Sequence, residues 1–470
     1  MNDPSWYSIL PPVLAIALAI WSKQVVVSLF AGIWLGHTLL SDFNPLTGIA
    51  RGLDGTVAVF ADAGDARVLM FTVLIGALIA TVEHSGGVRG FVHYLERRRW
   101  VHNGVRAQTL AWLVGLVIFV ESNITLLVAG SVSRPLFDRY RVSREKLAYL
   151  IDSTSAPVCV MIPLNAWGAF IISVVASTGI ENPLQVFIAA IAFNFYAIVA
   201  IVLAAVVIWK NLNIGPMQAA EARTARGELS WPDSTVMIET DDKVTGQDDG
   251  DTPSAWFMLL PIAALVLMMS VALAITGDGD LIRGSGSTSV LWSVCLALVV
   301  AWTQILLKGD SSVATLTRVF MTGAGNLLPI AIILLLALAL GDVAKLLGTG
   351  AFVANAVSGS VTPVLLAPLV FLLSAFIAFS VGSSWGTFAI MIPIAMPIAT
   401  SLGLSEPLLL GAAMSGALFG DHASPISDTT VMASMAAASD HIEHVRTQLP
   451  YALLAAAIAT VGFLVTGMVI

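Results

Sequence analysis

Long runs of apolar residues alternate with short polar segments along most of the chain. Runs close to the roughly 20 residues that a helix needs to cross bilayer hydrocarbon fall into two sets. The first set covers residues 7–22, 25–41, 67–83, 147–176 and 184–209, and the second covers 255–275, 287–307, 319–341, 407–435 and 448–469. One further apolar stretch lies between the third and fourth runs of each set, at 109–133 and at 362–400. This pattern predicts an all-α polytopic membrane protein.

The charges that flank the two additional stretches predict how each one enters the membrane. Nine of the 22 basic residues border 109–133, namely Arg97, Arg98, Arg99, Arg106, Arg134, Arg139, Arg141, Arg144 and Lys146. Both flanks are therefore expected on the cytoplasmic side, and 109–133 is predicted to be a re-entrant hairpin with Glu121, Ser122 and Asn123 near its tip. Residues 346–445 contain no Lys or Arg, so the stretch at 362–400 is predicted to be a hairpin that enters from outside.

An odd number of crossings in each set gives the two halves opposite orientations, as in many secondary transporters. The chain is thus expected to form two inverted-topology repeats of about five transmembrane helices, each with a re-entrant hairpin and a broken helix. The first repeat would cover residues 1–210, an acidic cytoplasmic linker 211–253, and the second repeat 254–470. The broken helices are expected at about 147–176 and 407–435. Two unrelated bundles joined by a linker are the alternative.

Composition supports the membrane assignment and excludes several other classes. Hydrophobic residues make up 57% of the 470 residues and charged residues only 11%, whereas soluble domains contain about 25% charged residues. Six of the eight net negative charges come from residues 211–253, which hold nine acids and three bases, and this linker is expected to be disordered. No basic arm suggests nucleic acid. Cys159 and Cys295 lie within apolar runs, so thiol metal sites are not expected.

Polar residues interrupt four of the apolar stretches. Inside hydrocarbon such a cluster means that the helix is broken against protein or a wet cavity, and we expect the four breaks to converge near the bilayer midplane. Their polar, Gly and Pro residues are Glu121, Ser122, Asn123 and Thr125; Asp152, Ser153, Thr154, Ser155 and Pro157; Ser380, Gly382, Ser383, Ser384 and Thr387; and Asp421, His422, Ser424, Pro425, Ser427, Asp428, Thr429 and Thr430.

The side chains of these breaks favour a small hard cation. Carboxylates, hydroxyls, an amide and freed carbonyls are hard oxygen ligands, so Na⁺ or Li⁺ is the expected guest and protons would compete for it. A carboxylate at bilayer depth costs roughly 2.5–3.5 kcal/mol on insertion scales, and Asp152 or Asp421 could exchange a proton for a cation. In contrast, Asp440, His441, Glu443 and His444 are expected to form a solvated face of the cytoplasmic loop at 436–447.

Three segments of the chain resemble a known family. They are FVESNITLLVAGSVSRPLFDRYRVSREKLAYLIDSTSAPV at 119–158, SVGSSWGT at 380–387 and GDHASPISDTT at 420–430. In them the chain resembles the NhaC-type sodium/proton antiporters of the ion transporter superfamily. The resemblance implies exchange of a small cation for protons through an elevator-like motion.

The same resemblance assigns roles to individual residues. It implies an ion-binding cluster of Asp152, Ser153, Thr154, Ser155, Asp421, His422, Ser424, Ser427, Asp428 and Thr429. It also implies hairpin tips that bind an ion or a substrate, formed by Glu121, Ser122, Asn123 and Thr125 in the first half and by Gly382, Ser383, Ser384 and Thr387 in the second.

Three functions compete at this stage. The leading hypothesis is antiport of Na⁺ or Li⁺ against H⁺, and the second is Na⁺- or H⁺-coupled transport of a small organic anion or amino acid. The third is a channel or a membrane receptor. An enzyme is not expected, since nucleotide-binding and flavin motifs are absent, and neither is a cofactor beyond the transported or coupling Na⁺ and H⁺. The protein is expected in the cell (inner) membrane as a multi-pass protein in contact with lipid, and a homodimer is left open.

Overall fold

The computed structural model describes residues 6–22, 24–88, 90–91, 101–119, 121–163, 165–231, 254–279, 284–309, 311–349, 352 and 362–469. Within these residues the regular structure is helical, without strands, and eight helical segments are long and apolar enough to cross a membrane. The all-α membrane architecture is thereby confirmed. Lys23, the basic residues Arg97, Arg98 and Arg99, and linker residues 232–253 lie outside the described residues.

The first half of the chain forms a series of helices interrupted at the two predicted places. Its helices are η1 (Trp6–Ile9), α1 (Leu10–Ser22), α2 (Val25–Leu39), α3 (Pro45–Ala58), η2 (Val59–Ala61), α4 (Ala63–His84), α6 (Gly104–Val117), α7 (Ser122–Arg139), α8 (Arg144–Asp152), α9 (Ala156–Cys159), α10 (Ala166–Ser177), α11 (Pro183–Ile191) and α12 (Phe195–Lys210). α6 and α7 pack against each other, so the stretch around 109–133 is a pair of neighbouring helices. Its re-entrant course through the membrane stays a prediction.

The second half of the chain follows the linker and is also helical. Its helices are α14 (Trp256–Thr276), α15 (Gly286–Lys308), α16 (Val313–Leu346), η3 (Pro363–Leu365), α18 (Leu366–Val381), α19 (Ser384–Leu402), α20 (Glu406–Ala423), α21 (Asp428–Ala437) and α22 (His441–Val469). The pair α18 and α19 occupies the place of α6 and α7, and α20 with α21 occupies the place of α8 to α10. The inverted relation of the two halves stays a prediction.

One amide side chain serves both breaks of the first half. Asn165 caps α10 by accepting a hydrogen bond of 3.0 Å from the Gly168 amide. Its Nδ2 also donates to the carbonyl oxygens of Phe119, at 2.8 Å, and Cys159, at 2.9 Å. Phe119 lies between α6 and α7, and Cys159 ends α9. Asn165 therefore satisfies backbone groups that both interruptions set free.

Serines perform the same task in the second half. α18 ends at Gly382, whose φ of 72° is left-handed, and Ser383 caps α19 by accepting from the Gly386 amide at 3.3 Å. Ser424, in the break between α20 and α21, donates to the Phe379 carbonyl of α18 at 2.7 Å. Each break of a long helix is thus hydrogen-bonded to the hairpin of its own half.

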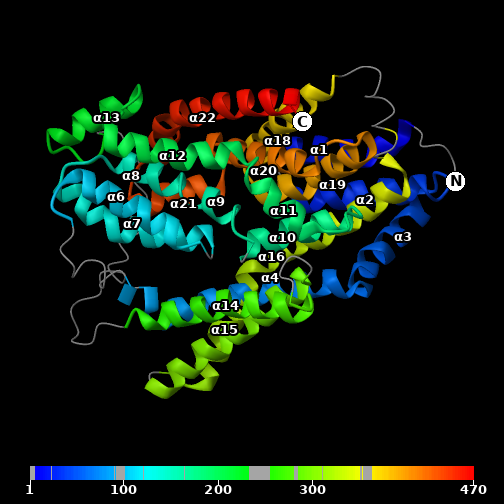
Figure 1. Ribbon diagram of the computed structural model, residues 1–470, viewed down its shortest axis with the longest axis horizontal. Helices are drawn as coiled ribbons and strands as arrows, with labels where there is room; N and C mark the ends of the chain where they lie inside the picture. The colour runs from blue at the N-terminus through cyan, green and yellow to red at the C-terminus, as the bar shows by residue number, and fades with distance from the viewer. Residues whose placement is uncertain are drawn as a thin grey trace.

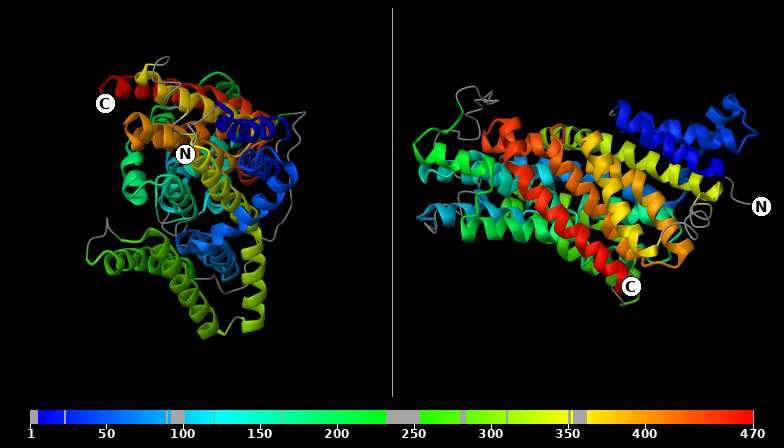
Figure 2. Two further views of the ribbon diagram at one scale, coloured as in Figure 1. Left: turned by 90° about the vertical axis from the view of Figure 1, so that its right-hand side faces the viewer. Right: turned by 90° about the horizontal axis from the view of Figure 1, so that it is seen from above.

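The broken helices also connect the two halves. α10 packs against α19, and α21 packs against α7 and α8, so each broken helix contacts the hairpin of the other half. The Trp167 and Trp385 rings, 4.6 Å apart, join α10 to α19. α14 and α15 pack on α4 at one side of this body, as Figure 1 and Figure 2 show, and α15 also contacts α10. The four breaks therefore lie in one helical body to which both halves contribute.

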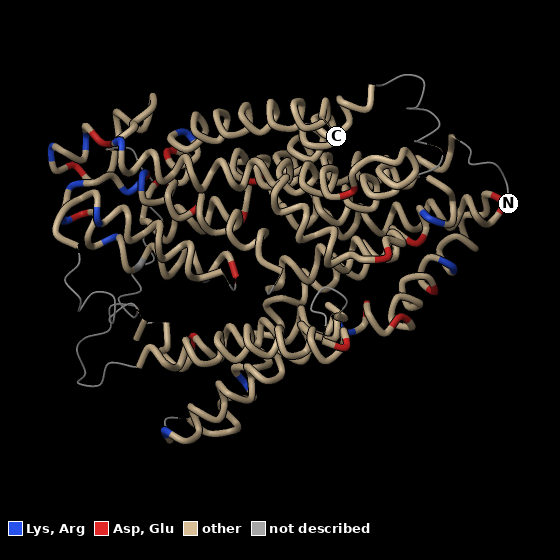
Figure 3. Tube along the Cα trace, viewed as in Figure 1, with Lys and Arg blue, Asp and Glu red and all other residues tan. Residues whose placement is uncertain are grey.

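The first part of the linker is folded. Residues Pro216–Ala225 form helix α13, and Met217 and Ala220 on it are fully buried. The expectation of a disordered linker is wrong over this stretch, because apolar side chains at helical spacing dock α13 on the bundle. Lys and Arg gather at the end of the molecule where α6, α7, α8 and α13 meet (Figure 3). That this end faces the cytoplasm stays a prediction of the charge bias.

Close packing of α18 and α20 gives a test of the fold. A Cβ on Gly416 would lie 2.1 Å from the Phe371 carbonyl oxygen, whereas nothing lies within 4 Å of a Cβ on Gly325 in α16. Gly416→Ala is expected to lower the midpoint of thermal unfolding in detergent, because overpacking typically costs about 1–3 kcal/mol. Gly325→Ala is the control and should unfold at the wild-type temperature or slightly above it. Equal midpoints for the two variants would contradict the contact.

Candidate functional site

Asp421 lies at the end of α20 and is surrounded by hydroxyl groups from the break that follows. Ser427 donates to its Oδ1 at 2.9 Å, and Thr429 donates to its Oδ2 at 2.8 Å. The two hydroxyl oxygens are themselves 3.0 Å apart, and Ser427 also caps α21 by accepting from the Thr430 amide. The Asp421 side chain is 0% exposed. Carboxylate and hydroxyl oxygens thus converge at one buried point.

Asp152 lies at the end of α8 and has different neighbours. Gln448 of α22 donates from Nε2 to Asp152 Oδ2 at 2.7 Å. The nearest imidazole nitrogens are Nε2 of His444, 3.5 Å from Oδ2, and Nε2 of His422, 3.9 Å from Oδ1. The Asp152 side chain is also 0% exposed. Two imidazoles and an amide therefore surround this acid, whereas hydroxyls surround Asp421.

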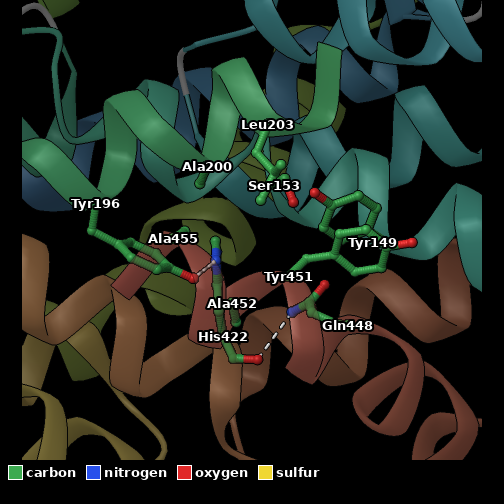
Figure 4. A pocket seen from close by; sticks show the side chains of 10 residues that line it. All are labelled: Tyr149, Ser153, Tyr196, Ala200, Leu203, His422, Gln448, Tyr451, Ala452 and Ala455. Atoms are coloured by element: carbon green, nitrogen blue, oxygen red, sulfur yellow. Dashed lines mark hydrogen bonds between the residues drawn. The ribbon is translucent and has the colours of Figure 1, made fainter. Parts of the chain in front are cut away.

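Gln448 hydrogen-bonds to Asp152 in the first half of the chain and to the residue after Asp421 in the second half. Besides Asp152, its Nε2 reaches the carbonyl oxygen of His422 at 3.0 Å, one residue beyond Asp421. His422 Nδ1 is 3.0 Å from the Tyr196 hydroxyl. Figure 4 shows both interactions beside a small cavity, together with the rings of Tyr149 and Tyr451.

Several polar atoms of this site retain unused hydrogen-bonding capacity. Within the described residues, no partner is found for Asp152 Oδ1, Gln448 Oε1, His422 Nε2 or either ring nitrogen of His444. Buried polar atoms without partners are costly. A proton, a water molecule or a cation at this place would satisfy them.

The remaining predicted residues of the two broken helices mostly bond to backbone. Thr154 donates to the Leu150 carbonyl at 2.8 Å, and Ser155 donates to the Asp152 carbonyl at 3.1 Å. Ser153 lines the small cavity. Asp428 is exposed, and its carboxylate accepts from the Thr429 amide. Thr154, Ser155 and Ser424 therefore support the breaks, and Ser427 and Thr429 contact an acid directly.

Polar side chains of the first hairpin tip hydrogen-bond to one another and to nearby backbone. Glu121 Oε1 accepts from the Ser122 hydroxyl and from the Asn123 amide, each at 3.1 Å. Thr125 donates to the carbonyl oxygens of Ile118 and Glu121. A Cβ on Gly115, near the end of α6, would collide with Thr154. The tip is therefore pressed against the first broken helix.

The second tip contacts backbone carbonyl groups of the second broken helix. A Cβ on Gly382 would lie 2.6 Å from the Ile426 carbonyl oxygen, and the Ser384 hydroxyl donates to the Ala417 carbonyl at 3.4 Å. Thr387 donates to the Ser383 carbonyl. Over the part of the chain described, no hydrogen bond joins a tip side chain to Asp152 or Asp421. The tips lie near the breaks, but their hydroxyls bind backbone or, for Ser122, the Glu121 carboxylate, and not Asp152 or Asp421.

Four residues of the site were not expected from the sequence. His444 was expected on a solvated loop and is 0% exposed. That expectation is wrong because α22 begins at His441, which places His444 within the helix. His444, Gln448 and Tyr451 follow one another at spacings of four and three, which puts them on one helix face. This spacing was the available signal, whereas Tyr196 had none, because it reaches His422 only through the tertiary fold.

The donor set determines what the site can bind. The oxygens of Asp421, Ser427 and Thr429 suit a small hard cation, and the Asp152 group offers nitrogen and carboxylate atoms that suit a proton. Among the described residues, no group of three or more His, Cys, Asp or Glu side chains could hold a metal ion. The site thus combines hard oxygen ligands around Asp421 with imidazole and carboxylate groups around Asp152.

A helical membrane bundle with two interrupted helices, each with a buried acid near its break, is typical of secondary transporters. The sequence model of the Na⁺/H⁺ antiporter family matches residues 158–468. The chain belongs to this family and is a multi-pass membrane antiporter, not an enzyme. The predicted resemblance to sodium/proton antiporters is confirmed.

The relatives with a named activity are antiporters and differ in what they carry. An uncharacterised protein of Haemophilus influenzae is 33% identical, covering 98% of this chain and 91% of that relative. The arginine/ornithine antiporter ArcD of Halobacterium salinarum is 29% identical over 47% of this chain and 44% of its own. The malate-2H⁺/Na⁺-lactate antiporter of Bacillus subtilis is 33% identical over 37% of each.

A solved structure shares the fold. The YdaH transporter of Alcanivorax borkumensis aligns with a TM-score of 0.61 and 14% sequence identity, covering 96% of this chain and 98% of that one. This likeness concerns the fold alone.

The Gln448 bridge can be tested by stability. Gln448→Leu removes both hydrogen bonds and leaves a buried carboxylate and a buried carbonyl unpaired, at about 1–3 kcal/mol for each group. Its thermal unfolding midpoint in detergent is expected to fall by several degrees. Gln185→Leu, on the exposed side of α11, is the control and should change little. If Gln448→Leu is as stable as this control, the two hydrogen bonds of Gln448 do not stabilise the fold.

Proposed function

We propose that the protein exchanges Na⁺ or Li⁺ for H⁺ across the membrane by alternating access. The observation that carries this proposal is the pair of fully buried acids, Asp152 and Asp421, which lie at the ends of two interrupted helices. Gln448 bonds Asp152 and the carbonyl oxygen of His422, the residue after Asp421. Neither carboxylate requires a bound cofactor to bind an ion.

The chemical difference between the two acids supports exchange. The hydroxyls on Asp421 can reorient to present their oxygens to a cation, since a hydroxyl both donates and accepts. Asp152 has two imidazoles nearby, which can take up or release a proton. In a site that cannot hold a cation and the proton together, binding of one ion releases the other.

Burial supports alternating access rather than a permanent pore. Both carboxylates are 0% exposed, so an ion can reach them only after the surrounding helices move. The body that contains the four breaks is packed through α10 with α19 and through α21 with α7 and α8. An elevator-like displacement of this body would carry both acids together.

A second candidate is Na⁺- or H⁺-coupled transport of a small organic anion or amino acid. The ArcD and malate/lactate relatives carry such solutes by name. In this chain the buried indole N–H of Trp167 has no acceptor among the described residues, and its ring lies against Trp385 of the second tip. A free donor at this place suits an acceptor oxygen of an organic solute.

Proton flux in proteoliposomes tests the proposal. The purified protein is reconstituted with a pH dye inside and an imposed pH gradient, and Na⁺, Li⁺, K⁺, malate, lactate, arginine and ornithine are added singly. We expect Na⁺ or Li⁺ alone to dissipate the gradient in a saturable way. If inorganic cations do nothing until one of the organic solutes is present, the second candidate replaces the first.

Neutral variants test the two acids. Asp152→Asn and Asp421→Asn are each expected to reduce exchange at least about 100-fold, because an amide cannot hold either a proton or the charge of a carboxylate. Both should still elute as folded protein in detergent. Asp54→Asn, on the exposed surface of α3, is the matched control and should exchange at the wild-type rate. Wild-type exchange in either acid variant would exclude that residue from the mechanism.

A further inference from the structure

A buried ion pair fixes the linker helix α13 to the start of α8. Arg223 of α13 donates to both carboxylate oxygens of Glu145, at 2.7 and 3.0 Å. The two side chains are 1% and 3% exposed. Arg223 also donates to the backbone carbonyls of Glu228 and Leu229, and its guanidinium lies 4.8 Å from the ring centre of Trp231. Its hydrogen bonds to Glu145 dock the linker on α8, and its other contacts hold the linker residues that follow α13.

A second group of contacts binds the same end of α8. Glu221 of α13 accepts from both the amide and the hydroxyl of Ser143, at 2.8 and 2.6 Å, and Ser143 is the residue that caps α8. Lys146 is fully buried and lies 3.6 Å from Glu221. Its Nζ donates to the side chains of Asn211 and Asn213. Charged and polar linker side chains thus enclose the first turn of α8.

The linker also contacts α22. The Ile214 amide donates to the Tyr451 hydroxyl at 2.8 Å, and this hydroxyl donates to the Leu212 carbonyl at 2.9 Å. The Tyr451 ring stacks on the Tyr149 ring of α8 at 4.5 Å. Tyr451 lies one turn beyond Gln448 on α22, so the segment that binds α8 also holds the helix that donates to Asp152.

We propose that residues 211–231, the linker clasp, position Asp152 by holding α8 and α22 in a fixed relation, with Arg223 and Glu145 as positioning residues. Glu145 and Asp152 are seven residues apart on one helix, so they lie on nearly the same face about 10 Å from each other. A rotation or shift of the first turn of α8 is therefore transmitted to Asp152. The expected effect on Na⁺ transport rests on the proposed cation exchange, whereas the expected effect on the position of α8 does not.

Charge reversal tests the clasp in the full-length protein. Glu145→Arg and Arg223→Glu each place like charges together, and the double variant restores opposite charges with their positions exchanged. Each single variant is expected to raise the KM for Na⁺ at least about fivefold with kcat changed less than about twofold, because the acid is displaced but retained. The double variant should return toward the wild-type KM.

Hydrogen exchange of the backbone amides gives a readout that does not depend on transport. In detergent, amides of residues 144–152 are expected to lose protection in each single variant and to regain it in the double variant. If the wild type exchanges no cation, the proposed function fails, and the hydrogen-exchange comparison still decides whether the clasp holds α8.

Two further variants keep the test decisive. Arg223→Lys retains the positive charge but cannot bond both carboxylate oxygens of Glu145 in the same way. It should fold even if the charge-reversal variants do not, and its rise in KM should be smaller than theirs. Asp54→Arg reverses an exposed charge on α3, outside the clasp, and should leave KM and protection unchanged. The proposal would be overturned if Arg223→Lys and a folded single charge-reversal variant both kept the wild-type KM and the wild-type amide protection of α8.

Discussion

A helix can be interrupted inside a membrane only if protein groups replace the backbone hydrogen bonds that are lost. This requirement shapes the structure around its four breaks. Asn165 donates to carbonyls of two separate interruptions, and Ser424 links the second broken helix to α18. Because each partner comes from a neighbouring helix, a break fixes the position of that neighbour. The interruptions therefore hold the hairpins and broken helices together as one body.

The same breaks give the two acids different surroundings. Asp421 precedes an interruption rich in serine and threonine, so local chain geometry brings hydroxyls to it over eight residues or fewer. Asp152 precedes the sequence Ser153-Thr154-Ser155, in which Thr154 and Ser155 bond to backbone, and it depends on α20 and α22 for its partners. One acid is thus served by its own half of the chain and the other by the opposite half. Their chemistry can therefore differ although each lies at the end of an interrupted helix.

This difference also explains how much could be predicted from the sequence. The breaks are local events marked by Gly, Pro, Ser and Asp in an apolar run, and the structure places them where they were expected. Asp421 with Ser427 and Thr429 was likewise within reach of local reasoning. Gln448, however, meets Asp152 across 296 residues, and no pattern within either segment reveals that pairing. His444 was misjudged because its charged neighbours made a helix start resemble a loop, and α13 was missed because overall acidity concealed its buried Met217, Ala220 and Arg223.

Access to Asp152 is constrained by these long-range contacts. Exposing it by moving α8 alone would break the Gln448 hydrogen bond, separate the stacked rings of Tyr149 and Tyr451, and leave Glu145 and Arg223 as unpaired buried charges. Loss of one partner from a buried ion pair typically costs about 3–5 kcal/mol, which is large for a step repeated in every transport cycle. Moving α8, α13, α20 and α22 together preserves all of these interactions. The contacts that bury the acid therefore favour displacement of the whole body over opening of a single helix.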